Sequence, residues 1–422
     1  MSVLDPRDLV AAHSALEYDG DGTLYLAGRP ADQWYESLPT PCLLLLPGRA
    51  AENARSYQSA FARALPGSSV YYALKACYQR HVVSAVVSAG VGLEVMSELE
   101  LGLAQELGIG GNRLIVNGLG RSESFTRAAL AVTPRLIVVD SAWDLAVTER
   151  LAAERGQVAP VALRLSVPAG EAAADRLGFA WKQEFLDVLA RVHESAWLRP
   201  DGVLLHGLSQ CADPERLRKH LNVAVGALWE LWFSHGRSFP IVDIGGGLAS
   251  RLAIETGSAG LEAFARAAAD ELSGVPYPIE VICEPGRTLV ADAAVGLATS
   301  VATKRRANAD WHIIDIGTNM LVPVPGARFP PAPVRWRPGA AASPAGLGDQ
   351  SCTSAAVCTD VLLPVDAERM LVLDAGAYTH VFSHVWGPEL PAVVAITDGG
   401  PELITASEDY TRILHTMQGY AR

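Results

Sequence analysis

One lysine follows an apolar run in a chain that otherwise uses almost no lysine. Lys75 comes directly after Val70–Leu74, and it is one of only four lysines among 34 basic residues. A primary amine in a partly desolvated site has a lowered pKa and can attack a carbonyl to form an imine, which an arginine cannot do. The alternative is a surface lysine at the exit of a strand. Because arginine replaces lysine nearly everywhere else, the sequence favours imine chemistry at Lys75.

Two further segments carry groups that suit an anion and a cationic nitrogen. The triplet Gly245-Gly246-Gly247 follows an apolar run, and glycines let backbone N–H groups approach a phosphate closely. A second segment reads Glu284-Pro285-Gly286-Arg287. An arginine can hold a phosphate through two parallel hydrogen bonds, and a carboxylate such as Glu284 can pair with a cationic nitrogen. A plain tight turn and a surface Glu–Arg pair are the alternatives.

Polar side chains also stand at the ends of other apolar runs. They are Glu94, Asn117, Arg164 and His206, with Ser209 shortly after the histidine. A single histidine is usually a satisfied core or surface group, but this one belongs to a larger set. A carbonyl partner for the lysine, a phosphate for the glycines and the arginine, and a basic nitrogen for the glutamate together describe pyridoxal 5′-phosphate (PLP).

The elements that must position these residues alternate between strand and helix patterns from about residue 69 to 284. Such alternation implies parallel strands, and eight strand runs indicate a closed (β/α)8 barrel with its site at the carboxyl ends of the strands. An open doubly wound sheet is the alternative, although no Gly-x-Gly-x-x-Gly follows the first strand. The predicted strands are Val70–Leu74, Gly92–Val95, Arg113–Val116, Arg135–Val139, Val161–Leu165, Gly202–Leu205, Pro240–Ile244 and Glu280–Cys283.

The two ends of the chain have a different residue pattern from this central part. After residue 290, strand-like runs follow one another without helical spacers, which predicts a second, antiparallel β-domain. Pro, Gly and Ala crowd residues 322–348, which indicates a long loop. The segments Gly22–Ala27 and Leu38–Leu46 are strand-like and could join the C-terminal strands. The predicted organisation is a barrel over residues 48–290 and a β-domain built from residues 1–47 and 291–422.

Composition limits the class of protein. The chain has 422 residues, of which 50% are hydrophobic and 19% charged, so it can bury a large core and is not disordered. A net charge of −12 without a basic run argues against nucleic acid as a partner. The sequence shows neither a signal peptide nor an apolar run long enough to span a bilayer. Six scattered cysteines predict neither disulfides nor a metal site, so we expect a cytoplasmic protein that does not bind a membrane.

The motifs, taken in order, resemble the fold-type III PLP-dependent decarboxylases, the group of ornithine, arginine and diaminopimelate decarboxylases. Tyr72-Ala-Leu-Lys75-Ala-Cys77 is similar to the lysine motif of that family, and Asp374-Ala-Gly-Ala-Tyr378 is similar to its C-terminal motif. The resemblance covers about residues 22 to 400. It implies an alanine-racemase-like PLP barrel with a second β-domain, as the composition also predicts.

The resemblance also implies a role for each residue of the site. Lys75 would form the imine with PLP, Glu94 would lie near the cofactor, and Glu284 would partner the pyridine nitrogen. The pyridine face would stack on His206, and Arg164 would complete the contacts to the cofactor. The phosphate would be held by the remaining set, which is Ser209, Gly245, Gly246, Gly247, Gly286, Arg287 and Tyr378.

Members of this family form a head-to-tail homodimer in which a partner loop with a cysteine completes each site. The loop here is predicted to be Gly348–Ser354, with Cys352 as the cysteine that delivers a proton to the substrate. Cys358 is the competing assignment. Diamine-forming relatives carry an acidic residue directly after that cysteine, whereas this chain has Thr353, with Asp360 as a possible substitute. A neutral hydroxyl does not offset a buried ammonium, so plain ornithine or lysine is disfavoured.

The predicted reaction is decarboxylation of an amino acid or of a metabolite derived from one. Loss of CO2 leaves electrons that the protonated pyridine ring absorbs, and Glu284 favours that protonation. The alternative on the same fold is an amino-acid racemase or epimerase, which places an arginine at the pyridine nitrogen. A non-catalytic PLP carrier is a third class, but the second domain and the cysteine loop argue against it. Relatives of this family often carry lysine at the positions of Arg121 and Arg176. These two arginines either face a substrate carboxylate or only reflect the preference of this chain for arginine over lysine.

Overall fold

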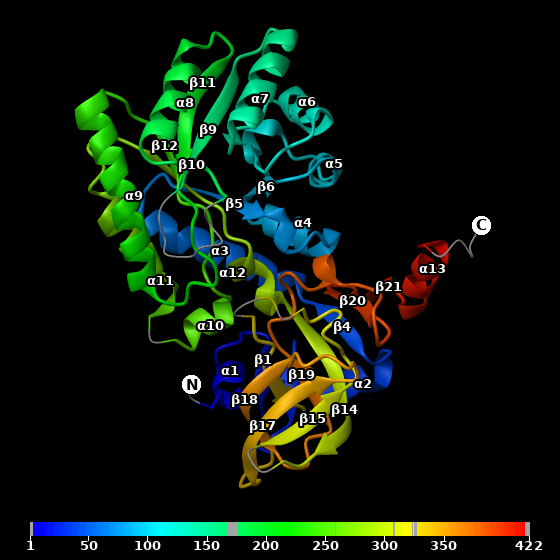
Figure 1. Cartoon of the computed structure of the whole chain (residues 1–422). Helices are drawn as coiled ribbons and strands as arrows, with labels where there is room; N and C mark the ends of the chain where they lie inside the picture. The colour runs from blue at the N-terminus through cyan, green and yellow to red at the C-terminus, as the bar shows by residue number, and fades with distance from the viewer. Residues whose placement is uncertain are drawn as a thin grey trace.

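The computed structural model describes residues 3–166, 176–257, 259–306, 309–322, 324 and 327–417. Figure 1 shows a barrel of parallel strands ringed by helices in the upper part and a β-sheet domain in the lower part. The blue N-terminal segment lies among the yellow and orange C-terminal strands of the lower part (Figure 1). Strand β4 (Cys42–Leu45), from the N-terminal part of the chain, pairs there with the C-terminal strands β14 (Ala294–Lys304) and β20 (Ala392–Thr397).

All eight predicted barrel runs are strands. Each pairs in parallel with its neighbours in the order β9-β11-β12-β13-β5-β6-β7-β8, and the pairing of β8 with β9 closes the ring. This closure excludes the open-sheet alternative. A short strand, β10 (Phe179–Ala180), extends the pairing at β9. The barrel strands are β5 (Ser69–Ala73), β6 (Gly92–Val95), β7 (Leu114–Val116), β8 (Leu136–Val139), β9 (Ala159–Ser166), β11 (Leu198–Leu204), β12 (Ile241–Asp243) and β13 (Glu280–Cys283).

Local signals in the sequence set the ends of the barrel helices. In α7 (Ala142–Arg155), the Oγ of Ser141 accepts from the backbone N–H of Asp144, and Gly156 ends the helix at φ +62°. Its buried residues recur at helical spacing, so one face packs on the barrel. The other helices around the barrel are α3 (Pro47–Ala64), α4 (Arg80–Ser88), α5 (Glu98–Glu106), α6 (Glu123–Val132), α8 (Gln183–Glu194), α9 (Pro214–His235), α10 (Arg251–Glu255), α11 (Gly260–Leu272) and α12 (Arg287–Val290).

The interior of the barrel is a packed core of side chains from the strands. Eight of them form one buried cluster, namely Tyr71, Ile115, Leu136, Val138, Ala162, Leu204, Ile241 and Ile282. A Cβ at Gly92 would lie 2.5 Å from the ring of Tyr71, so the glycine makes room for the aromatic ring. Since side chains of a strand alternate between its two faces, Ala73 points into the barrel like Tyr71, and the segment after it emerges at the carboxyl end.

The β-domain is built on a large sheet whose strand order is β18-β17-β15-β14-β4-β20-β21. The predicted segment Leu38–Leu46 supplies β4, which lies between β14 and β20. The sheet is mostly antiparallel, but the pairs β15–β17 and β4–β20 are parallel, which differs from the prediction. Its strands are β4 (Cys42–Leu45), β14 (Ala294–Lys304), β15 (Asp310–Ile314), β17 (Ala342–Asp349), β18 (Cys358–Pro364), β20 (Ala392–Thr397) and β21 (Gly400–Thr405), and β19 (Arg369–Val372) joins β14 to β16 (Pro331–Pro333).

The prediction of one long loop over residues 322–348 is wrong in part. Both β16 and most of β17 fall within it, while residues 323, 325 and 326 lie outside the described part of the chain. The small residues of β17 have a packing reason, because a Cβ at Gly346 would lie 2.9 Å from the ring of Trp311 on β15. Small side chains here let an aromatic ring cover the strand, so a composition typical of loops is found in a sheet.

The first residues of the chain form a separate small layer. The predicted strand Gly22–Ala27 supplies β2 (Leu24–Leu26), which pairs with β1 (Leu16–Tyr18) and β3 (Arg29–Pro30) rather than with the large sheet. The remaining helices are α1 (Pro6–Ala11), α2 (Ala31–Ser37), α13 (Ser407–Met417) and the 3-10 turns η1 (Leu74–Ala76), η2 (Gly111–Arg113), η4 (Ala291–Ala293) and η5 (His380–Phe382). Among the described residues, no helix is long and apolar enough to cross a membrane.

Candidate active site

A pocket of about 510 Å³ opens at the carboxyl ends of the barrel strands. Parallel strands of a barrel end on the same face, so residues distant in sequence meet there. Most of the residues predicted to hold a cofactor line this pocket, namely Lys75, Glu94, Arg164, His206, Ser209, Gly246, Gly247, Glu284, Gly286, Arg287 and Tyr378. Gly245 belongs to the same turn as the two lining glycines.

Lys75 sits in η1, the single turn that follows β5. Its Nζ lies 2.5 Å from Oε2 of Glu94 on β6, and its side chain keeps 36% of its surface exposed. Burial lowers the pKa of the Lys75 amine, but the nearby carboxyl groups of Glu94 and Glu284 more than offset this, so the pKa is raised overall. The expected lowering is therefore wrong for the chain without cofactor, because sequence spacing does not reveal how close the two carboxylates lie.

His206 follows β11 and is held as a neutral imidazole. Burial and the positive charges of Arg164 and Lys75 lower the pKa of His206 to about 3. Its Nδ1 is buried and has no hydrogen-bond partner among the described residues. A Cβ at Gly245 would lie 2.4 Å from the Cβ of His206, so only glycine allows the turn to pass this close. The histidine thus presents an uncharged ring beside the glycine turn.

The glycine triplet forms a turn between β12 and the following segment. The backbone N–H of Gly245 donates to Oδ1 of Asp243 at 2.8 Å, and φ is +67° at Gly245. A Cβ at Gly246 would lie 2.2 Å from the carbonyl oxygen of Glu284, and a Cβ at Gly247 would lie 2.2 Å from that of Leu208. Three strand-end segments therefore approach at distances that exclude any side chain.

Glu284 follows β13 and lies deep in the pocket. It is 6% exposed, and its Oε1 has no donor among the described residues. Burial raises the pKa of Glu284 well above its usual range, and the charges of Asp243 and Glu94 add to this. A buried carboxyl needs donors for its oxygens, and because Glu284 lines the pocket, a protonated ring nitrogen there would be one such donor.

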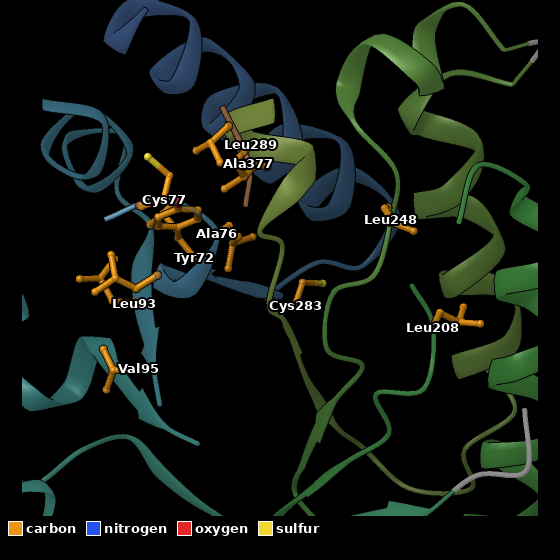
Figure 2. Close-up of a cluster of buried hydrophobic side chains, with 14 of the residues drawn as sticks. Tyr72, Ala76, Cys77, Leu93, Val95, Leu208, Leu248, Cys283, Leu289 and Ala377 are labelled. Carbon is orange, nitrogen blue, oxygen red and sulfur yellow. Dashed lines mark hydrogen bonds between the residues drawn. The ribbon is translucent and has the colours of Figure 1, made fainter. Parts of the chain in front are cut away.

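Arg287 and Tyr378 form the side of the pocket where the two domains meet. The guanidinium carbon of Arg287 lies 5.0 Å from the ring centroid of Tyr378. The backbone N–H of Tyr378 donates to the carbonyl of Ala76 at 2.8 Å, which ties the tyrosine segment to the segment of Lys75. Figure 2 shows the apolar layer that supports this region, with Tyr72, Ala76 and Cys77 together with Leu289 and Ala377.

Arg164 lies near the carboxyl end of β9, on the opposite wall. Its Nη1 lies 3.5 Å from Oδ2 of Asp140, and its Nη2 donates to the carbonyl of His206 at 3.4 Å. Burial lowers the pKa of Arg164, although Asp140 and Glu284 oppose this. The guanidinium thus adds positive charge to the wall beside the histidine.

The residues that line the pocket fit PLP. The glycine turn forms a cradle without side chains, Glu284 lines the same pocket with a carboxyl group, and Lys75 offers an amine there. Arg287 supplies a cation for a phosphate. The donor set therefore matches a molecule that carries an aldehyde, a phosphate and a basic ring nitrogen.

The predicted loop residues do not reach the pocket of their own chain. Cys352 is exposed, and Cys358 is buried at the start of β18, where burial raises the pKa of its thiol to about 11. The Oγ1 of Thr353 accepts from the N–H of Ala355, and Asp360 is exposed at φ +57°. None of the four is among the described residues that line the pocket.

The sequence analysis assigned no role to Asp243, and it left two alternatives open for Arg121 and Arg176. Asp243 lies directly beneath the glycine turn with no exposed surface, and its signal in the sequence is a carboxylate inside the apolar run Pro240–Ile244. Arg121 is buried and donates to the carbonyls of Gly118 and Val138, which favours a structural role. Arg176 is exposed, and its neighbours 167–175 lie outside the described residues.

Comparisons with known proteins agree with this geometry. The family model described as "Pyridoxal-dependent decarboxylase, pyridoxal binding domain" matches residues 51–291, which is more than half of the chain. The diaminopimelate decarboxylase of Aquifex aeolicus (strain VF5) is 25% identical over 412 residues and covers 94% of this chain and 96% of its own length. That of Actinosynnema pretiosum subsp. auranticum is 29% identical over 410 residues, covering 92% and 91%.

Solved structures show the same fold. The crystal structure of diaminopimelate decarboxylase from M. jannaschii with L-lysine has a TM-score of 0.83 at 22% identity and covers 94% of this chain and 95% of that one. The lysine/ornithine decarboxylase from Vibrio vulnificus with putrescine has a TM-score of 0.70 at 21% identity, covering 87% and 97%. These comparisons give the racemase alternative no support. The chain belongs to the pyridoxal-dependent decarboxylases of fold type III, and it is a PLP-dependent carboxy-lyase.

Proposed function

We propose that this decarboxylase removes CO2 from an amino acid, or a metabolite derived from one, with its PLP held on Lys75. The observation that carries the assignment is that Lys75, Glu284 and the glycine turn, which follow three different strands, line one pocket. The bound cofactor supplies an aldehyde for imine formation and a ring that withdraws electrons from the reacting carbon. The barrel over residues 48–290 provides the pocket, and the β-domain provides Tyr378.

The lysine and its neighbouring carboxylate control a proton at one atom. Lys75 must lose a proton from Nζ before it can attack a carbonyl. Glu94 Oε2, at 2.5 Å, is placed to accept that proton. The same pair can return a proton to the amine when the product leaves, since protonated Lys75 is the favoured state of the chain alone.

The remaining residues orient the cofactor. Glu284 is proposed to accept a hydrogen bond from the ring nitrogen, which keeps that nitrogen protonated. His206 is proposed to lie against the ring face, where its neutral imidazole adds no charge. The glycine turn, Gly286, Ser209, Arg287 and Tyr378 are proposed to hold the phosphate, with Arg164 beside them.

A partner subunit is proposed to complete the site. The loop Gly348–Ser354 exposes Cys352 and does not reach the pocket of its own chain, which suits donation to a second copy in a head-to-tail homodimer. The partner's Cys352 would then deliver a proton to the substrate carbon. Substrate contacts are proposed from Thr353 in this loop and from Cys358 and Asp360 on β18.

The mouth of the pocket favours a substrate whose far end is not a second ammonium group. Met96, Leu119, Val324 and Phe382 line the mouth, and three of these side chains are 42–48% exposed. Apolar walls do not compensate a buried charge. Although the relatives named above include diaminopimelate and lysine/ornithine decarboxylases, Thr353 and this mouth support a less polar side chain. We also propose that the protein is located in the cytoplasm.

The test is a panel of L- and D-amino acids, including diaminopimelate, ornithine, lysine and amino acids with uncharged side chains, assayed for CO2 release with PLP. The proposal expects stoichiometric CO2 and amine from at least one amino acid, with higher kcat/KM for an uncharged side chain. Inversion at Cα without CO2 would contradict decarboxylation. The best kcat/KM on a diamine-forming amino acid would contradict the substrate class alone.

A further inference from the structure

Two buried carboxyl groups, Asp243 and Glu284, lie against each other beneath the glycine turn. They stand at the ends of the neighbouring strands β12 and β13, and the backbone N–H of Glu284 donates to the carbonyl of Gly245 at 2.7 Å. Their side chains are close enough to hydrogen-bond to each other. Asp243 has no exposed surface and Glu284 is 6% exposed. Both carboxyl groups are therefore largely removed from bulk solvent.

Each carboxyl keeps one oxygen without a donor. Oδ1 of Asp243 accepts from the N–H of Gly245, but its Oδ2 has no donor among the described residues, and neither does Oε1 of Glu284. Two facing acceptors repel each other unless a hydrogen lies between them. One shared proton satisfies both groups, since one carboxyl then donates and the other accepts.

The charges around the pair agree with one shared proton. Burial raises the pKa of both Asp243 and Glu284. Glu94 adds to the rise, whereas Lys75 opposes it, and Arg164 faces Asp243 from β9 with a positive charge. In the chain alone, the two carboxyl groups therefore hold one proton between them.

We propose that Asp243 is a positioning residue that stays protonated in the loaded enzyme and donates a hydrogen bond to Glu284. The inference rests on the proposed role of Glu284 at the ring nitrogen. A cation at Glu284 stabilises the negative charge on that carboxylate, so the shared proton is bonded to Asp243. No proton enters or leaves the pair. One lone pair of Glu284 is then satisfied by Asp243, and its other oxygen is fixed toward the ring nitrogen.

Net charge supports this arrangement. A protonated Asp243, an ionised Glu284 and a cationic nitrogen sum to zero, whereas two ionised carboxylates and one cation leave a buried negative charge. A protonated carboxyl that serves as a hydrogen-bond donor in a buried site is a known way to orient charge. The geometry thus gives Asp243 a purpose besides holding Gly245.

The first experiment detects the proton on Asp243 directly. Infrared difference spectra of the PLP-loaded enzyme at neutral pH, wild type minus Asp243→Asn, should contain the carbonyl stretch of a protonated carboxylic acid that shifts in D2O. The amide of the variant retains both the acceptor for Gly245 and the donor for Glu284, so the variant should fold. A difference spectrum without that band would overturn the proposal.

The second experiment measures the protonation of the ring nitrogen from the 15N NMR resonance of labelled PLP. Asp243→Asn should keep the nitrogen protonated and PLP affinity within about threefold, because the hydrogen bond to charged Glu284 is retained. Asp243→Ala should move the resonance toward that of neutral pyridine, while PLP stays bound through Lys75 and the phosphate contacts. A purely structural role would weaken PLP binding without moving the resonance of the PLP that remains bound, and that result would overturn the proposal.

Two controls separate the possible failures. Asp144→Asn removes another buried carboxylate, at the start of α7 and outside the pocket, and should leave the resonance unchanged. Glu284→Gln should move the resonance more than any Asp243 variant. If Glu284→Gln moves it and Asp243→Ala does not, only the role of Asp243 is wrong. If neither moves it, the role proposed for Glu284 is wrong as well. A shift with Asp243→Asn equal to that with Asp243→Ala would also contradict the protonated state.

Discussion

The amine of Lys75 lies 2.5 Å from the carboxylate of Glu94, and this contact keeps the lysine protonated in the chain without cofactor. A protonated amine cannot attack an aldehyde, so the proposed loading of PLP on Lys75 must include removal of that proton. The ion pair therefore has two effects. It opposes loading at neutral pH, and it provides the acceptor that makes loading possible.

Replacing Glu94 should change how loading depends on pH. Glu94→Gln removes the nearer negative charge from Lys75, so the pKa of the amine falls and the rate of PLP uptake rises at lower pH. The midpoint of the rate profile should move down by about one to three pH units. Stopped-flow absorbance of imine formation measures it. The matched control is Glu230→Gln, which removes the partner of the exposed Lys182 and should leave the profile in place; an unmoved Glu94→Gln profile would contradict the account.

Glu284 should be needed for turnover and not for retention of PLP. Glu284→Gln keeps the size of the side chain but removes the charge that holds the ring nitrogen protonated, so kcat should fall by about 10²–10³-fold. The PLP content after gel filtration should stay near that of the wild type, since Lys75 and the phosphate contacts remain. Glu98→Gln, on the exposed surface of α5, serves as the control with unchanged kcat. Loss of PLP together with loss of turnover would instead assign Glu284 a role in binding.

The glycine turn should not tolerate a methyl group at its middle position. In Gly246→Ala the new Cβ would meet the carbonyl oxygen of Glu284 at 2.2 Å, and backbone atoms must move to relieve this contact. We expect weaker PLP binding, measured by fluorescence titration. Gly226→Ala is the control, because a Cβ there meets nothing within 4 Å in α9, and it should stabilise the fold by about 0.4–1 kcal/mol. Equal PLP affinity in both variants would contradict the cradle.

Stability should fall as pH rises toward 7 because of Asp374. Burial, and then the charge of Asp292, raise the pKa of Asp374 from 3.8 to about 7. Between those two values the folded chain binds a proton that the unfolded chain has released, so this contribution is present below pH 4 and is lost as pH passes 7. Asp374→Asn should flatten the free energy of unfolding across this window in urea titrations. Parallel curves for variant and wild type would refute the assignment.

Much of the fold follows from residue patterns that are local. Apolar β-branched runs separated by helical stretches predict eight strands, and because parallel strands end on one face, Lys75, His206 and Glu284 could be placed together from sequence alone. Glycine at three consecutive positions also marks the turn, since the approach of neighbouring backbones excludes side chains there.

The features that sequence reasoning missed depend on neighbours across the barrel. The sign of the pKa shift at Lys75 is set by the distance to Glu94 on the next strand, which no spacing rule supplies. Asp243 was not singled out, because only the pairing of β12 with β13 brings it against Glu284. The small residues of β17 led to the wrong prediction of a loop. They are small because the ring of Trp311, on the neighbouring strand, packs over them.

The role of Lys75 is the central claim, and one measurement addresses it most directly. PLP-loaded enzyme is reduced with borohydride, digested and mapped by mass spectrometry, which fixes PLP on whichever lysine forms the imine. The chain has four lysines, so the possible answers are few. The account predicts the adduct on Lys75 alone, and no adduct in Lys75→Ala. An adduct on Lys182, Lys219 or Lys304 in place of Lys75, or none on any lysine of an active preparation, would contradict it.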